Sequence, residues 1–409
     1  MWIDLMRILH TADLHLGRQF MGLSLEEDHE VILGQILETL VADRVDVLVI
    51  AGDVFDRASP PNSSIRQFNR FLKRVAEETE AAVVMISGNH DSGDRIEAMS
   101  VFSTASRVLV RGIADAVEAP LVLRDPHGEV AFSALPFSYE YAAREVFGDE
   151  SIDAPAEVVA AQIAAARRQV PDGARWVVVA HAFVAGGAVG ETERALTRVG
   201  GIETVPSNVF DGADYVALGH LHKPQEVGAS HIRYSGAPLA FGFDEAGNEK
   251  SMTVVDLQAE GAEIRTVPFR PIRQVRSLTG AFSDLLEGTP SDDFIQAILT
   301  DENPLIDPMK RLRATYPNAC HLAYARQERA AETEALGSGR AITRRTCRYS
   351  VRRSRFRCPD RLRPTSREGE QAQQRVAHRR NDEGEDVACL ARNDADNERD
   401  GRTANDSRT

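Results

Sequence analysis

Cysteine, aromatic residues and long hydrophobic runs are all scarce in this chain of 409 residues. Its four cysteines, Cys320, Cys347, Cys358 and Cys389, match no zinc motif in their spacing, so we expect free thiols in a reducing compartment. No apolar run reaches the roughly 18 residues of a transmembrane helix, and the first residues lack the basic and apolar segments of a signal peptide. These absences argue against a disulfide scaffold and a membrane span, and they predict a cytoplasmic protein.

Positive charge is also in short supply, because the formal net charge is −14 and the pI about 5.3. An acidic chain has little non-specific attraction for a polyanion such as DNA. Nucleic acid stays open as a substrate, since a local basic groove or bound metal ions can supply the charge that phosphates need. Hydrophobic residues make up 43% of the chain, which is enough for two or three packed domains with mostly aliphatic cores.

The end of the chain has a different composition. No lysine follows Lys310, and from residue 336 the chain is rich in arginine up to Arg380 and then in Asp, Glu and Asn. Large apolar residues are sparse there and no period is visible, so we predict a disordered tail over residues 336–409. Its arginine-rich block suits contact with DNA. A segment translated out of frame is an alternative that explains the same composition.

Strands and helices alternate along the first part of the chain. MRILHTADLH, DVLVIAGD and AAVVMISGNHD have the pattern of strands that run into polar turns, and Glu26–Arg44 and Pro60–Glu80 have helical spacing. A hairpin turning at DPHG, two more helices near Ser138–Val146 and Ala154–Val170, and five later strands follow, including HIRYSGAPLAF. The order predicts an α/β domain over residues 1–272, with two sheets packed face to face and helices outside. Residues 275–335 predict a second, small α+β domain of two helices and two strands.

Five strands end in a polar signature. In chain order these are D-L-H with Asp13 and His15, G-D-V-F-D-R with Asp53 and Asp56, G-N-H-D with Asn89, His90 and Asp91, the lone His181, and G-H-L-H with His220 and His222. Ligands of open α/β sheets bind beyond the carboxyl ends of the strands. We therefore expect all five signatures to meet at one edge.

The donors at that edge predict a metal centre. Carboxylate and amide oxygens suit hard ions and imidazole suits borderline transition metals, so the mixture favours manganese or iron, then zinc, over calcium. The donors are too many for one tetrahedral site. Two ions about 3.5–4 Å apart and bridged by one carboxylate fit better, and Asp53, directly after Gly52, is placed to be the bridge. Such a pair favours hydrolysis of a phosphate ester.

Each signature has a plainer interpretation when it is taken alone. A D-x-H or a G-N-H-D sequence is equally typical of a capped turn, and a single histidine at a strand end is more often a core residue than a ligand. We expect Asp91 to cap the following helix, His10 to be packed, and His29 to lie on a solvated helix surface. Only the ordered set of five makes the metal centre the favoured hypothesis.

The ordered set resembles the calcineurin-like metallophosphoesterases. The stretches ILHTADLHLG, VIAGDVFDRASPP, GNHDS and GHLHKPQ, with YSGAPLAFGF, resemble more narrowly the SbcD-type nuclease subunits of the bacterial SbcCD complex. The similarity covers about residues 6 to 335. It implies a four-layer αββα sandwich, a capping domain at 275–335, and two divalent ions, Mn²⁺ ahead of Mg²⁺ or Fe²⁺.

The resemblance also implies a role for each residue. Asp13, His15, Asp53 and His222 would hold one ion, and Asp53, Asn89, His181 and His220 the other. His90 would face the scissile phosphate as an acid or as a stabiliser of charge. Asp56 would orient the His90 ring and keep it protonated.

The implied activity is a nuclease that cuts duplex ends as an exonuclease and single strands or hairpins as an endonuclease, in DNA repair and recombination. Implied partners are DNA, a second copy of the chain, and an SbcC-type coiled-coil ATPase. The tail shows no amphipathic helix, so it departs from the family pattern at the segment that docks the ATPase. The alternatives are a phosphoesterase for a phosphoprotein or cyclic nucleotide, and a non-catalytic subunit that binds DNA ends.

Overall fold

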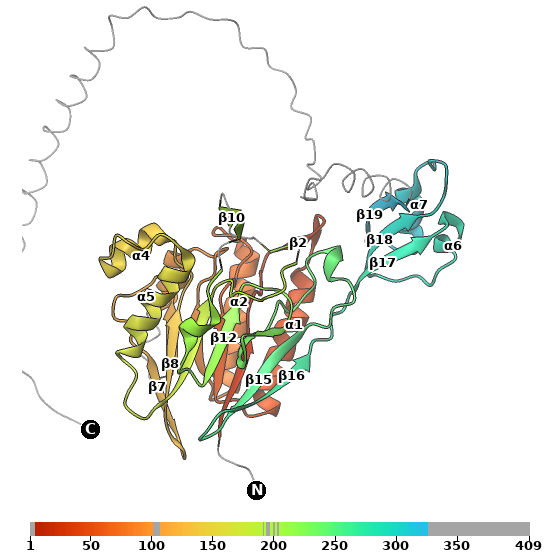
Figure 1. Cartoon of the computed structure of the whole chain (residues 1–409). Helices are drawn as coiled ribbons and strands as arrows, with labels where there is room; N and C mark the ends of the chain where they lie inside the picture. The colour runs from red at the N-terminus through yellow and green to blue at the C-terminus, as the bar shows by residue number, and fades with distance from the viewer. Residues whose placement is uncertain are drawn as a thin grey trace, which may run out of the picture. The chain divides into compact units, whose positions relative to one another are not determined.

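Two six-stranded sheets form the larger part of the computed structural model (Figure 1). It describes residues 5–100, 107–190, 192–193, 197–198, 201–202 and 204–325. The first sheet has a parallel centre made by β1, β4, β5 and β6, and an antiparallel edge made by β15 and β16. In sheet order its strands are β16 (Ala262–Pro268), β15 (Ser251–Leu257), β1 (Met6–Thr11), β4 (Val47–Ala51), β5 (Ala82–Ile86) and β6 (Val108–Arg111).

The second sheet repeats this plan, with a parallel centre and an antiparallel strand at each edge. In sheet order its strands are β13 (Gln225–Val227), β14 (Ala229–Tyr234), β12 (Tyr215–Gly219), β9 (Arg175–His181), β8 (Gly128–Leu135) and β7 (Leu121–Asp125). The predicted hairpin at DPHG is the β7–β8 pair. The predicted strand HIRYSGAPLAF is too long, because β14 ends at Tyr234 and Gly236 has a positive φ of 78°.

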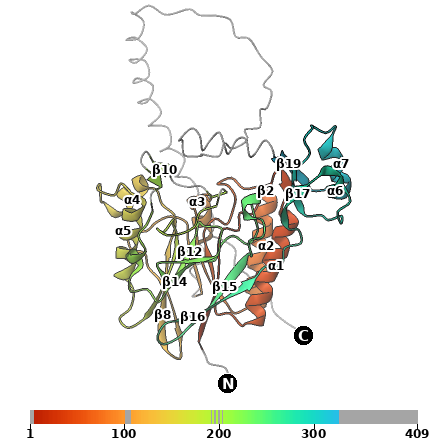
Figure 2. The ribbon, with the colours of Figure 1, turned by 45° about the vertical axis from the view of Figure 1, so that its right-hand side comes forward.

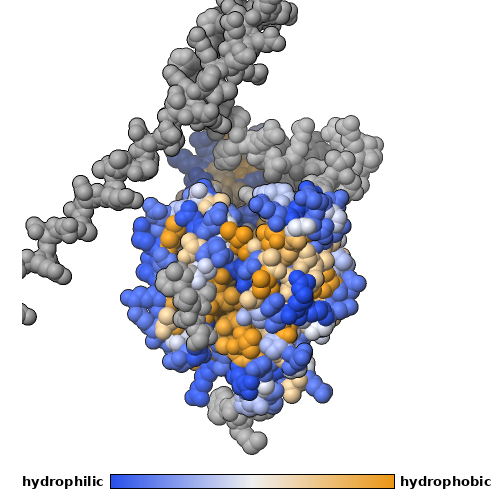
Figure 3. All heavy atoms as spheres, turned by 90° about the vertical axis from the view of Figure 1, so that its left-hand side faces the viewer, coloured by the Kyte–Doolittle hydropathy of each residue, from blue (hydrophilic) through white to orange (hydrophobic). Residues whose placement is uncertain are grey.

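Helices cover the outer face of each sheet (Figure 2). α1 (Glu26–Ala42) and α2 (Asn62–Glu78) pack on the first sheet in one apolar cluster. α5 (Pro155–Arg167) packs on the second sheet, and α4 (Glu140–Phe147) packs on α5. The face that carries α4 and α5 shows hydrophobic patches between hydrophilic residues (Figure 3). Side chains of both sheets fill the space between them, so the predicted αββα order is confirmed.

Short elements connect these layers. They are β2 (Gln19–Phe20), β3 (Leu23–Ser24), α3 (Gly93–Glu97), β10 (Thr197–Arg198), β11 (Gly201–Ile202) and the 3₁₀ turns Ser207–Phe210 and Phe243–Glu245. No helix in the described part of the chain is both long and apolar enough to cross a bilayer.

The residues after Arg273 build a separate sheet with its own apolar core. Its three parallel strands are β17 (Val275–Gly280), β18 (Phe294–Leu299) and β19 (Ala319–Tyr324), and its helices are α6 (Phe282–Leu286) and α7 (Pro308–Thr315). β17 was not predicted from the sequence. Phe294 joins this sheet to the larger core, where its ring stacks on Phe20 at 4.8 Å between centroids. The predicted tail, 336–409, lies outside the described residues.

Candidate active site

The five polar signatures meet where the parallel strands of both sheets end. Asp13 and His15 follow β1, Asp53 follows β4, and Asn89 and His90 follow β5. His181 ends β9, and His220 and His222 follow β12. Three groups of possible ligand atoms lie within 4.8 Å of one another, namely Asp13 with His15 and His222, Asp13 with Asp53 and His181, and His15 with Asp56 and His90.

Asp53 lies at the centre of the site. Its Oδ2 is 3.6 Å from the Nε2 atoms of both His15 and His181, which come from different sheets. Its Oδ1 accepts a hydrogen bond of 2.8 Å from the backbone N–H of His90. The carboxylate is buried, with 2% of its residue surface exposed. Asp53 is therefore held by one oxygen while the other faces two imidazoles.

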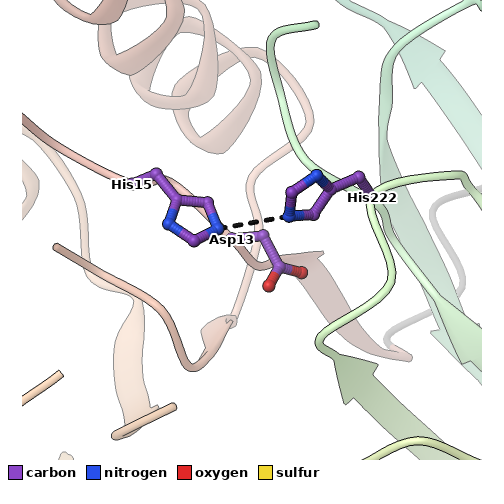
Figure 4. A group of neighbouring side chains, drawn as sticks. All are labelled: Asp13, His15 and His222. Carbon is purple, nitrogen blue, oxygen red and sulfur yellow. Dashed lines mark hydrogen bonds between the residues drawn. The ribbon is translucent and has the colours of Figure 1, made fainter. Parts of the chain in front are cut away.

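One half of the site contains Asp13, His15 and His222 (Figure 4). The Nε2 atoms of His15 and His222 are 3.2 Å apart, and the Asp13 carboxylate lies beside them. Both Asp13 oxygens also accept the backbone N–H of His220, at 3.0 and 3.1 Å. Asp13 thus ties the turn after β1 to the turn after β12.

The other half is centred on Asn89. Its Oδ1 lies 3.0 Å from His181 Nε2 and 3.0 Å from His220 Nδ1. The carboxamide oxygen and the two ring nitrogens therefore point at one another. The structure brings together all seven residues that the sequence predicts as metal ligands.

The backbone of the site is strained. Asp13, His15, Asp53 and His220 have positive φ angles of 53°, 46°, 50° and 107°. Asp and His are enriched among the few non-glycine residues with such angles, which cost of order 1–3 kcal/mol each and cluster at functional sites. The fold therefore holds these four side chains in directions that a relaxed turn would not give.

Two glycines of the site lie where the backbone leaves no room for a side chain. A Cβ at Gly88 would overlap the Asp53 carboxylate, and a Cβ at Gly219 would overlap the carbonyl oxygen of Ala51. Gly219 belongs to the second sheet and Ala51 to the first. Gly219 is therefore required by the close approach of the two sheets, whereas Gly88 is required by the packing of the G-N-H-D turn against Asp53 of the same sheet.

Hydrogen bonds orient the histidines. His181 Nδ1 lies 2.9 Å from the Ala51 carbonyl oxygen, which can only accept, so this nitrogen carries the proton and Nε2 keeps its lone pair toward Asp53. His222 Nδ1 lies 3.0 Å from the hydroxyl of Thr192. That hydroxyl donates to Glu245 Oε1 at 2.7 Å, so it accepts from Nδ1 and leaves Nε2 of His222 with a lone pair toward His15.

The Glu245 carboxylate ends this chain of donors. Its second oxygen pairs with the buried Lys250 ammonium, which also donates to the His222 carbonyl oxygen at 2.9 Å. Although burial opposes ionisation of Glu245, hydrogen bonds with His222 and the charge of Lys250 lower its pKa to about 2. Glu245 is therefore ionised at neutral pH, and it can only accept. Glu193 adds a further acceptor for the His222 N–H at 2.7 Å.

Burial controls the protonation of the ligand side chains. Loss of solvent lowers the pKa of His181 to about 3 and lowers the pKa values of His15 and His220 well below the usual range. Burial and then the nearby Asp53 charge raise the pKa of Asp13 well above its usual range. The imidazoles of His15, His181 and His220 are thus neutral, as ligands must be, and two adjacent buried carboxylates favour a positive charge between them.

The residues fit a divalent cation centre. The donors are carboxylate and amide oxygens together with neutral imidazole nitrogens, a set that suits Mn²⁺ or Fe²⁺. The carboxylates and imidazoles are buried and Asn89 is half-buried. The Nδ1 atoms of His181 and His222 are held by acceptors that fix the tautomer.

His90 lies at the edge of the site and touches Asp56 in an unexpected way. Its Nδ1 is 2.9 Å from the backbone carbonyl oxygen of Asp56. The Asp56 carboxylate instead accepts from Arg18 at 3.2 Å and lies 3.8 Å from His15 Nδ1. The predicted orientation of the His90 ring by Asp56 is therefore a main-chain contact.

Asp91 does not cap the following helix, and that expectation is wrong. Ser92 caps α3. The Asp91 carboxylate accepts the backbone N–H groups of Val54, Phe55 and Gly88, and burial raises its pKa to about 7. Asp91 therefore braces the two turns that carry Asp53 and Asn89.

The other histidine expectations have mixed outcomes. His10 is buried as predicted and contacts Tyr215 Oη at 2.9 Å and the Leu218 carbonyl oxygen at 3.1 Å. His29 is 1% exposed, so the prediction of a solvated position is wrong. Its side of α1 faces the core, next to Phe241.

Four residues around His222 were not predicted from the sequence, namely Thr192, Glu193, Glu245 and Lys250. No short motif marks them, because they reach His222 from two loops distant from one another in the chain. Only the fold reveals that they lie behind the same histidine.

Comparison with known proteins agrees with the fold and the site. The family model described as "Calcineurin-like phosphoesterase" matches residues 6–224. The chain therefore belongs to the calcineurin-like phosphoesterases, which are metal-dependent enzymes. A second model, described as "Type 5 capsule protein repressor C-terminal domain", matches residues 268–346.

A curated relative confirms the narrower resemblance to the SbcD type. The chain is 31% identical over 321 residues to the SbcD component of the nuclease SbcCD from Staphylococcus saprophyticus, and the match covers 78% of this chain and 84% of the relative. A solved structure, "GAP50 the anchor in the inner membrane complex of Plasmodium", matches with a TM-score of 0.41 and 10% identity over 78% of this chain and 97% of that one.

Proposed function

We propose that this chain is a DNA nuclease subunit that hydrolyses phosphodiester bonds at a centre for two divalent ions, Mn²⁺ ahead of Mg²⁺ or Fe²⁺. Asp13, His15, Asp53 and His222 would hold one ion, and Asp53, Asn89, His181 and His220 the other. When bound, such ions activate a water and neutralise phosphate charge.

The position of Asp53 is the observation that carries the proposal. One of its oxygens is 3.6 Å from a ring nitrogen of each proposed half-site. The other oxygen is anchored by the His90 N–H. This position supports the proposal that Asp53 belongs to both halves.

His90 is the proposed acid. Its Nδ1 is held by the Asp56 carbonyl oxygen, which fixes the proton on that nitrogen and turns Nε2 away from Asp56. It lines an open groove together with Asn89. With a second proton on Nε2, the ring would donate that proton to the oxygen that leaves the scissile phosphate, or stabilise the charge on that phosphate. Asp56 would act as a positioning residue through its backbone.

DNA as the substrate and an SbcC-type ATPase as the partner are supported by the SbcD-type relative. We further propose exonuclease action at duplex ends and endonuclease action on single strands and hairpins. We also propose that residues 1–272 form the nuclease domain, that 275–335 form a cap that presents DNA, and that the chain forms a homodimer. The cytoplasm stays a prediction, which cell fractionation would check.

Metal analysis of an Asp53 variant tests the centre. Wild-type protein should bind two Mn²⁺ per chain and degrade linear duplex DNA, and EDTA should stop it. Asp53→Asn should weaken binding of both ions and reduce cleavage by more than about 100-fold. Asp172→Asn, at an exposed turn, is the matched control and should change neither. Two tightly bound ions in Asp53→Asn would contradict the bridge.

The same preparation separates the substrate hypotheses. Cleavage of bis-p-nitrophenyl phosphate without cleavage of any DNA would replace the nuclease by a phosphoesterase for another ester. Metal binding without hydrolysis of either compound would favour the non-catalytic subunit.

A further inference from the structure

A pair of exposed, stacked tyrosines stands beside the candidate active site. Tyr139 and Tyr141 are 46% and 69% exposed, and within the described ranges they are the only aromatic residues among the large hydrophobic side chains that lie exposed. Their rings are 5.7 Å apart between centroids and only 11° from parallel. Exposed flat rings are unexpected in a chain with 6% aromatic residues, so they favour a binding function.

Hydrogen bonds fix this pair relative to the metal ligands. The loop after β8 donates the Phe137 N–H to the Ser87 carbonyl oxygen at 3.0 Å, directly before Gly88 and Asn89. Tyr139 then caps α4, and its carbonyl oxygen accepts the N–H groups of Ala142 and Ala143. The loop that carries the tyrosines is therefore hydrogen-bonded to the end of β5, which carries the G-N-H-D turn.

A series of rings connects the site to the surface. The Phe137 ring lies 6.5 Å from His181 and 5.0 Å from Tyr139, edge to face in both cases. Tyr139 in turn stacks on Tyr141, which is the more exposed of the two. One end of the series is a proposed ligand, and the other end is a flat ring that is largely open to solvent.

An open groove of about 580 Å³ contains both features. Asn89 and His90 line it, and so do Tyr139 and Tyr141. Arg57 and the 44% exposed Ile113 are also among its walls. A molecule that presents a phosphate to His90 can thus extend along the same groove to the tyrosines.

We propose that Tyr139 and Tyr141 form a shelf on which an unpaired nucleobase next to the scissile phosphate stacks. This inference rests on the proposed nuclease function and names the part of the substrate that the groove binds. A base in a duplex hides its faces in the stack, whereas an unpaired base offers a face to an aromatic ring. The net charge of −14 gives the chain little non-specific attraction for DNA, so stacking would add to the affinity that bound metal ions and Arg57 supply.

Fluorescence of 2-aminopurine tests the shelf directly. The probe is a single-stranded oligodeoxynucleotide with one 2-aminopurine, bound by the full chain with Ca²⁺ in place of Mn²⁺ so that cleavage is suppressed. Wild-type protein should quench the probe, because stacking on a ring quenches it. Tyr141→Ala should remove the quenching and weaken binding about tenfold. Tyr141→Phe keeps the ring and should behave like the wild type.

An abasic substrate makes the test specific. With Mn²⁺, wild-type protein should cleave the normal strand about tenfold more efficiently than a strand abasic beside the cut, and Tyr141→Ala should cleave both alike. Ile306→Ala, an exposed apolar residue outside the groove, is the control. Equal preference in Tyr141→Ala and wild type would overturn the shelf while the nuclease stands. An effect of Tyr141→Ala on ATPase assembly alone would overturn it in favour of a protein contact.

The same measurements distinguish a failure of the nuclease proposal from a failure of the shelf. If wild-type protein cleaves no DNA but still quenches 2-aminopurine through Tyr141, the shelf holds and the nuclease fails. If it cleaves DNA and the Tyr141 variants equal the wild type in every assay, the nuclease holds and the shelf fails.

Discussion

The Nε2 atoms of His15 and His222 face each other at 3.2 Å, although the two residues follow strands of different sheets. At this separation either one ring donates a proton to the other or both lone pairs converge on a cation. The Thr192 hydroxyl accepts from the Nδ1 side of His222, and burial lowers the pKa of His15. Both facts favour the convergence of lone pairs.

Removal of the Thr192 hydroxyl should weaken metal binding. Valine has the same shape as threonine but has no hydroxyl to accept from His222 Nδ1 and donate to Glu245. The Mn²⁺ affinity of Thr192→Val should therefore fall about 10–100-fold. Thr192→Ser keeps the hydroxyl and should stay near wild type. Titration of Mn²⁺ followed by electron paramagnetic resonance measures the affinity without any substrate. Equal affinity in the valine and serine variants would show that the hydroxyl only fills space.

Replacement of His90 should separate chemistry from metal binding. His90→Ala should reduce DNA cleavage by about 10²–10⁴-fold, because the proposed proton donor is lost. Its metal content, measured by plasma mass spectrometry, should equal that of wild type. His127→Ala, in the exposed β7–β8 turn, is the matched control. Loss of metal in His90→Ala would make His90 a ligand instead.

The main-chain contact of Asp56 leads to a different expectation for its side chain. Asp56→Asn retains the carbonyl oxygen that holds His90, so cleavage should fall far less than in His90→Ala. A loss as large as that of His90→Ala would show that the carboxylate, through Arg18 or His15, controls the reaction.

Metal binding should release protons from the site. Burial and Asp53 raise the pKa of Asp13 well above its usual range, so the metal-free chain keeps a proton there that a bound cation displaces. A proton bound more tightly in the folded than in the unfolded chain stabilises the metal-free fold. For Asp13 this stabilisation is complete below the unfolded pKa of about 4, and it is lost as the pH rises through the pKa of the folded state. Calorimetric Mn²⁺ titrations in buffers of different ionisation enthalpy measure the protons released. Their number should fall as the pH is raised, and no proton release at any pH tested would contradict the burial argument.

The approach of the two sheets should make Gly219 irreplaceable. Gly219→Ala places a methyl group against the Ala51 carbonyl oxygen, so the free energy of unfolding should fall by about 1–3 kcal/mol. Gly34→Ala is a control with the opposite expected sign, because a Cβ added at Gly34 on α1 would have no other atom within 4 Å. There the change should add about 0.5–1 kcal/mol. Urea unfolding of both variants measures the difference.

Periodicity and motif order were sufficient for the layers and for the convergence of the predicted ligands. Each polar turn follows a continuous buried strand, so its position at the sheet edge follows from chain direction. Strand order was less accessible, because β15 and β16 return to the first sheet from the far end of the domain. β17 was not predictable either, because the alternation in Val275–Gly280 is weak.

Side-chain partners beyond the ligands could not be predicted. His29 has polar neighbours in sequence, and only the packing of α1 shows that it is buried. The Glu245–Lys250 pair and Thr192 act on His222 across loops of variable shape, so no spacing rule connects them. Likewise, Asp91 has the sequence context of a helix cap, but its carboxylate turns back to three backbone N–H groups.

The positive φ angles at Asp13, His15, Asp53 and His220 set a limit on how this enzyme can evolve. Glycine would relax each of these positions at the expense of a donor atom. A laboratory selection for thermal stability alone should therefore accumulate glycine at these four positions and yield stable proteins without activity. A selection that also demands cleavage must find its gains far from the sheet edge.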